Sequence, residues 1–359
     1  MSDGIGLVFI FTLSVVFLTL PSQELADSAG LAWLEVLIHS VTSLVMLFIV
    51  LYVCRHVPGD LYTVCEVLLG KWGARAVMVY FCGAFFGDHT LLLRQFSENT
   101  LLTALPNTEF SVVITAYAVV AGLLVYIGIE GISRVSYFLA PFVVISLVLV
   151  LISLEPLYNV NRLAPYGGMG FGKCITTGLS LAGVNFGILL LPLLAPSFQT
   201  VSTMAVGGLF GMGLNTALHS VSILVYTIVF GIEMGQENVL PFFSMARTIY
   251  LNRYLQHLEA FFITLWVIVG TLTMAIDLFC GLYCLSRLGN LPALRPLIPI
   301  VAAGLTQLAM VPPDIHTAID LFSSIVYYYN IGMYAVPLLL LAALLIKRRG
   351  KVKTPWAAE

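Results

Sequence analysis

The chain has 359 residues, of which 60% are hydrophobic and 9% are charged, and its formal net charge is −2. A soluble domain carries roughly 25% charged residues, so these values exclude a soluble enzyme and a nucleic-acid-binding domain with a basic face. The mean hydropathy of +1.00 is typical of a protein that lies in a membrane.

Long apolar segments follow one another along the whole chain. Crossing the hydrocarbon core as a helix takes about 20 mostly apolar residues. No polar stretch between the segments is long enough for a soluble domain, so residues 1–359 are predicted to form one all-α membrane domain. We expect ten spans, at residues 4–28, 33–53, 74–99, 110–128, 132–154, 173–195, 203–230, 255–286, 292–311 and 316–346.

The ten spans divide into two groups of five, at about 4–154 and about 173–346, followed by a basic tail at 347–359. This division predicts a five-plus-five inverted repeat in which spans one and six are discontinuous. Such repeats place interrupted helices at a shared site near the middle of the membrane, where a small solute binds.

Most of the 16 Lys and Arg residues fall on one side of this arrangement, together with both ends of the chain. Connections rich in Lys and Arg stay in the cytoplasm, so both termini are predicted to be cytoplasmic. Met1-Ser2-Asp3 lacks the basic start of a signal peptide, and no cleaved leader is expected. Glu130 and Arg134, four residues apart on the same side, are predicted to form an ion pair at a helix end.

Span one is predicted to be interrupted near Thr12-Leu13-Ser14, before it continues past Pro21. The hydroxyl groups of Thr12 and Ser14 can bond backbone groups that an unwound turn sets free. No glycine is present at this place, so the interruption is a weaker inference than the one in span six.

Two amphipathic segments are predicted to lie along the membrane surface instead of crossing it. Residues 60–70 follow Pro58-Gly59 on the cytoplasmic side, and residues 239–254 lie on the outer side. The outer segment is either a lid over a vestibule or a simple connector.

Span three carries four ionisable side chains, although a charge at the bilayer centre costs about 2.5–3.5 kcal/mol on insertion scales. Asp88 and His89 fall near the middle of the span. They either relay protons or hold a cation, or else bond the backbone of a broken helix, and the two readings have equal weight. Arg94 and Glu98 are four residues apart and are predicted to form a structural ion pair near the outer end of the span.

Span six contains the clearest interruption, at Gly183-Val184-Asn185-Phe186-Gly187. A helix breaks inside the bilayer only where the freed backbone groups line a protein-buried or watery cavity, so one reading is a site for a small polar ligand. The other reading is that Gly183 and Gly187 form a pair of small residues that lets helices pack closely. On this feature alone the two readings are about equal.

Spans eight and ten add further polar groups. Thr271 and Thr273 lie near the middle of span eight, and either face the site between spans one and six or bond to their own helical turn. Asp277, nearer the cytoplasmic side, suits an inner pathway or an ion pair. Residues 327–330, three tyrosines and an asparagine in span ten, form a mixed aromatic and polar patch.

Motifs of catalysis and of nucleotide binding are absent: the sequence has no G-x-S-x-G, no H-E-x-x-H and no P-loop. The six cysteines have no C-x-x-C spacing and are expected to be buried thiols. The six histidines are too dispersed along the chain to predict a metal cluster. We therefore expect no enzyme activity, no cofactor and no metal site.

Several short stretches occur in an order and at a spacing that characterise one known family, although each stretch is weak alone. They are Phe17-Leu18-Thr19-Leu20-Pro21, Ala29-Gly30, Pro58-Gly59, Leu68-Leu69-Gly70-Lys71-Trp72, Leu93-Arg94-Gln95-Phe96-Ser97-Glu98, Leu105-Pro106-Asn107-Thr108, Gly128-Ile129-Glu130-Gly131-Ile132-Ser133-Arg134, Phe186-Gly187, Leu190-Leu191-Pro192, Met245-Ala246-Arg247-Thr248-Ile249, Leu258-Glu259-Ala260 and Trp266-Val267. In this set the chain resembles the B subunits of bacterial endospore germinant receptors, or spore germination permeases. These belong to the amino acid–polyamine–cation transporter superfamily.

The resemblance implies a LeuT-like fold of ten helices, with spans one and six unwound around a ligand the size of an amino acid. It also implies a complex with an A subunit and a lipoprotein C subunit in the spore inner membrane. In that complex the protein would sense a germinant and trigger germination. The alternative is an ion- or proton-coupled amino acid symporter on the same fold.

Two groups of residues are expected to carry the function. The predicted ion or proton pathway consists of Asp88, His89 and Asp277. The predicted ligand contacts are Thr12, Ser14, Gly183, Asn185, Phe186, Gly187 and Thr271.

Overall fold

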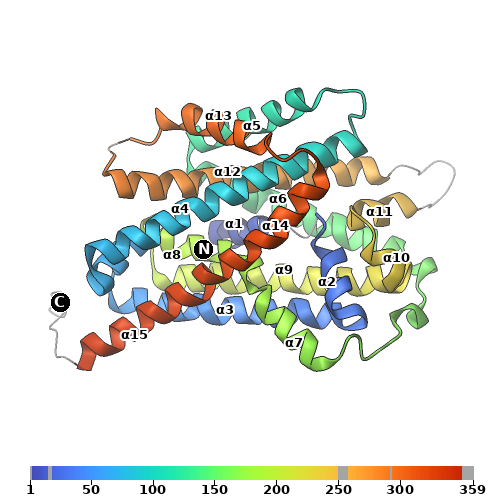
Figure 1. Ribbon diagram of the computed structural model, residues 1–359, viewed down its shortest axis with the longest axis horizontal. Coiled ribbons are helices and arrows are strands. Elements are labelled where there is room, and N and C mark those ends of the chain that lie inside the picture. Colours follow the sequence, from blue (N-terminus) through green and yellow to red (C-terminus); the bar gives the residue numbers. More distant parts are fainter. Residues whose placement is uncertain (1, 15–17, 250–257, 292, 350–359) are drawn as a thin grey trace.

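The computed structural model describes residues 2–14, 18–249, 258–291 and 293–349, and its regular structure in these ranges is helical (Figure 1). Eight of the described helices are long and apolar enough to cross a membrane. Shorter apolar helices at Gly4–Leu13 and Leu297–Ala309 are further candidates. The chain is thus a multi-pass membrane protein, and the count of ten spans stays a prediction.

The helices follow one another with short connections. In chain order the α-helices are α1 (Ser2–Leu13), α2 (Leu20–Ser28), α3 (Ala32–His56), α4 (Leu61–Thr103), α5 (Phe110–Ile127), α6 (Ile129–Ser153), α7 (Phe171–Ser180), α8 (Leu190–Leu193), α9 (Val201–Phe230), α10 (Ile232–Gln236), α11 (Pro241–Thr248), α12 (Leu258–Gly289), α13 (Leu297–Ala309), α14 (Ile315–Asn330) and α15 (Val336–Arg349). The tighter 3₁₀ segments are η2 (Ala29–Leu31), η3 (Glu155–Leu157), η4 (Val160–Leu163), η5 (Ala182–Leu189) and η6 (Ala195–Ser197), and η7 (Ile331–Ala335) is a π-helix.

Two sets of helices pack around the middle of the molecule. In one set α9 lies against both α1 and α3, and in the other α4 lies along α12, with α5 and α13 beyond them (Figure 1). Lipid tails are as apolar as these helices, so close van der Waals packing drives their association. At Gly211 of α9 a Cβ atom would lie 2.8 Å from the carbonyl oxygen of Ile5, which shows how closely α1 approaches.

Spans one and six are both interrupted, as predicted. In span one, α1 ends at Leu13 and α2 begins at Leu20, with Pro21 in its first turn, where proline fits because no amide partner is needed. In span six, α7 ends at Ser180, and eight residues of 3₁₀ helix (η5) separate it from the short α8.

Gly183 and Gly187 of η5 are required by close packing as well as by the interruption. A Cβ atom at Gly183 would lie 2.5 Å from the carbonyl oxygen of Val326 in α14. At Gly187 it would lie 1.7 Å from the ring of Phe11 in α1. The reading that these glycines let helices pack closely is therefore confirmed, whereas the reading of a ligand site stays a prediction.

Span ten is interrupted too, which the sequence analysis missed. The π-helix η7 separates α14 from α15, and such π-bulges are frequent at functional sites. The Tyr80 hydroxyl donates to the carbonyl oxygen of Tyr328 at 2.6 Å and accepts from the amide of Gly332 at 2.9 Å, so it holds both sides of the junction.

The two predicted surface segments are short helices. Residues 61–69 of α4 are separated from the long remainder by Gly70, whose backbone is not helical (φ 80°, ψ 172°). The predicted outer segment, residues 239–254, contains α11, and its residues 250–254 lie outside the described part, as do residues 350–359 of the basic tail. The interfacial position of both segments stays a prediction. The cysteines are free thiols, five of them buried, as expected.

Candidate functional site

The broken segment η5 presents two neighbouring side chains to two different buried polar clusters. Asn185 donates from Nδ2 to Nδ1 of His39 at 2.8 Å and to the hydroxyl of Ser43 at 3.2 Å. The next residue, Phe186, packs its ring on Tyr329, with 4.2 Å between the ring centroids. The side chains of Asn185 and Phe186 are both buried, so η5 links the two clusters inside the bundle.

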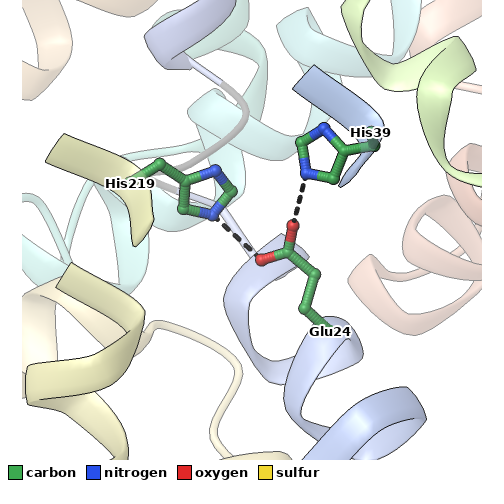
Figure 2. Close-up of side chains that lie close together, drawn as sticks. All are labelled: Glu24, His39 and His219. Atoms are coloured by element: carbon green, nitrogen blue, oxygen red, sulfur yellow. Dashed lines mark hydrogen bonds and ion pairs between the residues drawn. The ribbon is translucent and has the colours of Figure 1, made fainter. Parts of the chain in front are cut away.

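The first cluster, which we call the Glu24 cluster, consists of Glu24 on α2, His39 on α3 and His219 on α9 (Figure 2). Nε2 of His39 lies 3.1 Å from one carboxylate oxygen of Glu24, and Nε2 of His219 lies 2.9 Å from the other. Glu24 is 0% exposed and each histidine 2%. Leaving a buried polar group without its partner costs about 1–3 kcal/mol, so this cluster ties three helices together.

The cluster corrects the expectation that the histidines are too dispersed to gather around one point. The fold brings His39 and His219 within reach of one carboxylate, although they are far apart in the sequence. Sequence reasoning missed all three members. The available signal was a titratable side chain inside each of three apolar segments, which in a membrane needs a reason.

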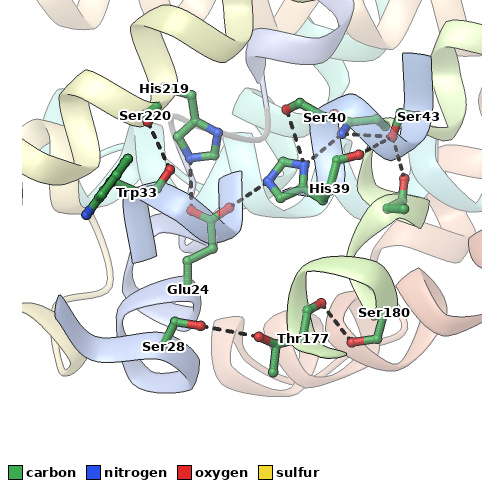
Figure 3. Close-up of polar contacts among 12 residues, drawn as sticks. Glu24, Ser28, Trp33, His39, Ser40, Ser43, Thr177, Ser180, His219 and Ser220 are labelled. Carbon is green, nitrogen blue, oxygen red and sulfur yellow. Dashed lines mark hydrogen bonds and ion pairs between the residues drawn. The ribbon is translucent and has the colours of Figure 1, made fainter. Parts of the chain in front are cut away.

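A wider network of hydroxyl groups surrounds the Glu24 cluster (Figure 3). Asn185 and Ser43 connect it to η5, and Ser220 donates to the carbonyl oxygen of Trp33 at 2.9 Å. Because the amide nitrogen of Asn185 can only donate, Nδ1 of His39 accepts, and His39 then carries its proton on Nε2, toward Glu24.

The second cluster, which we call the Asp88 cluster, consists of Asp88 on α4, Asp277 on α12 and Tyr329 on α14. The hydroxyl of Tyr329 donates to Asp88 at 3.4 Å, and Asp277 lies near enough to Asp88 for their charges to interact, although its own carboxylate oxygens have no hydrogen-bond partner among the described residues. Both aspartates are buried. Two carboxylates this close repel each other strongly unless a proton or a cation lies between them.

The structure thus brings together two of the three residues of the predicted ion or proton pathway. His89 points elsewhere, because its Nδ1 lies 2.8 Å from the carbonyl oxygen of Met274 on α12. Asp88 and Asp277 form a pair that the sequence analysis did not foresee, since they come from different halves of the chain. Their role in moving ions stays a prediction.

The predicted contacts from span one lie beside η5, but their hydroxyl groups are engaged within their own helix. Thr12 donates to the carbonyl oxygen of Val8 at 2.8 Å, and Ser14 donates to that of Phe11 at 2.9 Å. Both are buried at the end of α1, next to the gap before α2. They therefore stabilise the last turn of α1 at the interruption.

Thr271 does not join the other predicted contacts. Its hydroxyl donates to the carbonyl oxygen of Val267, and its side chain lines an apolar groove of about 500 Å³ with Tyr117 of α5. Thr273 faces α1: its hydroxyl lies 3.1 Å from the carbonyl oxygen of Val269 in its own turn and 3.3 Å from that of Ile10.

Two polar cavities approach the broken segment from opposite ends. One, of about 220 Å³, is lined by residues that include Gln23, Asp27, Leu181 and Ser323. The other, of about 150 Å³, is lined by residues that include Glu130, Leu194 and Gln199. Residues 182–193 between them are buried, so the segment is closed to both sides in this structure.

The predicted ion pairs are present and are structural. Arg94 pairs with Glu98 and lies over the ring of Phe110, 4.4 Å from its centroid. Arg134 and Glu130 are 3.8 Å apart and largely exposed, so their pair contributes little, about 0–1 kcal/mol.

A further ion pair, which the sequence analysis missed, joins the start of α4 to α12. Asp60 caps α4 by accepting from the amide of Thr63 at 3.1 Å. Its other oxygen lies 2.7 Å from Arg287 and accepts from the hydroxyl of Tyr283 at 2.7 Å. This cluster fixes one end of the α4–α12 pair that carries the two aspartates.

Comparison with known proteins agrees with the fold and the sequence resemblance. A family model described as "Spore germination protein" matches residues 2–317. Spore germination protein A2 of Bacillus subtilis (strain 168) is 23% identical over 358 residues, which cover 97% of this chain and 95% of that protein. Crystal structures of two mutants of the Eremococcus coleocola manganese transporter match with TM-scores of 0.65 at 11% identity, covering 96% of this chain and 76% of theirs. At that identity the likeness shows the fold alone, and it confirms the predicted all-α transporter fold.

Proposed function

The chain belongs to the spore germination protein family, and we propose that it is the transporter-like membrane subunit of a spore germinant receptor. In this role it binds a small germinant, an amino acid, beside the interruptions of spans one and six. Binding triggers germination through an A subunit and a lipoprotein C subunit in the spore inner membrane. The observation that carries the proposal is η5, a buried break whose adjacent side chains Asn185 and Phe186 contact two polar clusters.

An amino acid suits the groups around the interruption of span one. The last carbonyl groups of α1 carry partial negative charge and suit an ammonium group, whereas the first amide groups of α2 suit a carboxylate. The polar cavity beside Gln23 and Asp27 gives the ligand a way toward this place. Thr12, Ser14, Gly183 and the rest of the predicted set around η5 remain the proposed contacts, and Thr273 replaces Thr271.

The signal would pass to the partner subunits as a change in helix arrangement. A ligand shifts the balance between two arrangements only by the difference in its affinity for them. Because η5 packs against α1, α3 and α14, a ligand that displaces Asn185 or Phe186 alters the packing of three helices together.

Binding and uptake of labelled amino acids by the purified chain in liposomes tests this function. We expect saturable binding of at least one amino acid without accumulation, even under a proton gradient. Binding that is absent from the chain alone but present in the complex with the A and C subunits also supports a receptor. Absence of binding in both preparations contradicts it.

The second candidate function, a proton- or cation-coupled amino acid symporter, is favoured by the Asp88 cluster. A buried pair of carboxyl groups can carry a proton or a cation between the two sides of a membrane. In that case the liposomes accumulate the amino acid, and Asp277→Asn abolishes the accumulation driven by the gradient. A receptor subunit shows no accumulation for this variant to abolish.

A further inference from the structure

Glu24, His39 and His219 form a set of three ligand atoms that could meet at a single ion (Figure 2). We propose that the Glu24 cluster binds a divalent transition-metal ion of the Zn²⁺ type. The three atoms all lie within 4.8 Å of one another. Neighbouring ligand atoms of a tetrahedral Zn²⁺ site lie about 3.3–3.6 Å apart, at Zn–N and Zn–O distances of about 2.0–2.2 Å. The two histidine nitrogens lie 3.1 and 2.9 Å from the Glu24 carboxylate, so these contacts would open by a few tenths of an ångström to admit the ion.

The contact between Glu24 and His219 has the distance of a hydrogen bond without its geometry. Oε2 of Glu24 and Nε2 of His219 are 2.9 Å apart, yet neither atom has a partner that satisfies hydrogen-bond angles. Both atoms are buried, and buried polar atoms without partners are rare and costly. Oε2 of Glu24 and Nε2 of His219 are thus close together without a hydrogen bond of good geometry, as two ligands of the same ion would be.

The charges around the cluster also suit a divalent cation. In the part of the chain that the structure describes, the ion-pair partners of Glu24 are the two histidines, and neither Lys nor Arg pairs with it. Glu35 of α3 is 0% exposed, its carboxylate oxygens have no hydrogen-bond partner, and it lies near enough to Glu24 for their charges to repel. An ion of charge +2, with both imidazoles neutral, would offset the negative charge of Glu24 and ease its repulsion of Glu35.

The ligand types select the class of ion. Two imidazoles and one carboxylate favour Zn²⁺ and its transition-metal neighbours over Mg²⁺ and Ca²⁺, which prefer oxygen ligands. Three protein ligands leave a fourth position of a tetrahedral site for water or another small ligand.

Asn185 would connect the ion to the broken segment. When Nε2 of His39 binds a metal, its proton moves to Nδ1, which must then donate. Rotation of the Asn185 amide by half a turn brings its oxygen to the place where its nitrogen now contacts Nδ1 at 2.8 Å. The same side chain thus serves both states of the histidine, and the ion would tie α2, α3 and α9 to η5.

Zn²⁺ binding to the full-length purified protein in detergent, measured by titration calorimetry and by metal analysis after dialysis, tests the proposal. We expect one Zn²⁺ per chain, no competition from a large excess of Mg²⁺ or Ca²⁺, and affinity at least about tenfold weaker in Glu24→Gln and His219→Gln. His56→Gln is the matched control, since His56 lies on the same helix as His39 but outside the cluster, and it should bind like the wild type. Because the readout is metal binding, it does not depend on whether the protein responds to a germinant.

His219→Cys separates loss of the site from loss of the fold. A cysteine can still ligate the ion, so this variant should bind Co²⁺ and show the near-ultraviolet sulfur-to-cobalt absorption that the wild type lacks. Absence of Zn²⁺ binding in the wild type overturns the proposal. So does binding that all the cluster variants retain, because the ion then lies elsewhere.

Discussion

Asn185 is the single side chain through which the broken segment reaches the Glu24 cluster. Its amide contacts an imidazole and a hydroxyl group, and all three side chains are buried. An apolar residue of similar size would remove both contacts and, within the described part of the chain, leave Nδ1 of His39 with only the longer contact, 3.5 Å, to the hydroxyl of Ser40. An unsatisfied buried group costs about 1–3 kcal/mol, which is enough to change the balance between two helix arrangements several-fold.

We therefore expect Asn185→Leu to abolish the germination response while the protein is still inserted in the membrane. The measurement is release of dipicolinic acid from spores that carry the variant, together with the amount of protein in the inner membrane fraction. Asn215→Leu is the matched control, because Asn215 is equally buried and its side-chain oxygen has no partner to lose. A normal response from Asn185→Leu would mean that the ligand site lies elsewhere.

The ion pairs of Asp60 and Glu130 differ in burial, and we expect them to contribute differently to the free energy of unfolding. Asp60 is buried and bonds Arg287, Tyr283 and its own helix, so Asp60→Asn should lower the free energy of unfolding by about 1–3 kcal/mol. Glu130→Gln affects an exposed pair and should change it by less than about 1 kcal/mol. Thermal unfolding in detergent compares the two, and equal effects would contradict this ranking.

At the scale of elements, the interruptions of spans six and ten support each other. The side-chain oxygen of Asn330 accepts from the amide of Gly183 at 2.7 Å, and its nitrogen donates to the carbonyl oxygen of Ser180. Asn330 therefore satisfies two of the backbone groups that the break in span six sets free. Such groups must find partners inside the protein, because lipid supplies none.

Asn330→Leu should loosen the broken segment. We expect a loss of about 1–3 kcal/mol in stability and a weaker response to the germinant, since two partly buried backbone groups lose their partners. Hydrogen exchange of the amide of Gly183 should also become faster. Tyr327→Phe, on an exposed part of the same helix, should change none of these, and unchanged exchange at Gly183 in Asn330→Leu would show that another group holds the break.

The interruptions differ in how visible they are in the sequence. Span six could be predicted because two glycines and an asparagine stand inside an apolar run, and the glycines are needed where α14 and Phe11 approach. Span ten could not, because the partner that stabilises its π-helix is Tyr80, from another span. The contact is tertiary, and hydrophobic periodicity does not report it.

At the scale of the whole molecule, hydropathy was sufficient for the fold class, since the bilayer permits little besides helices. It could not reveal which polar residues meet. Asp88 and Asp277 were both identified as costly charges, but only the packing of α4 along α12 brings them together. Glu24, His39 and His219 were passed over because they lie in three separate spans, and only the fold gathers them.

The adjacency of Asn185 and Phe186 has a consequence for the thermodynamics of the two clusters. Because the two residues are adjacent in η5, a shift of this backbone that moves Asn185 away from His39 also moves Phe186 on Tyr329, and with it the hydroxyl group that reaches Asp88. We expect such a shift to couple the affinities of the two clusters, and linkage makes the effect reciprocal and equal in factor. Uptake of a proton beside Asp88 would then change the affinity of Glu24 for an ion by the same factor as binding of the ion changes the proton affinity of Asp88.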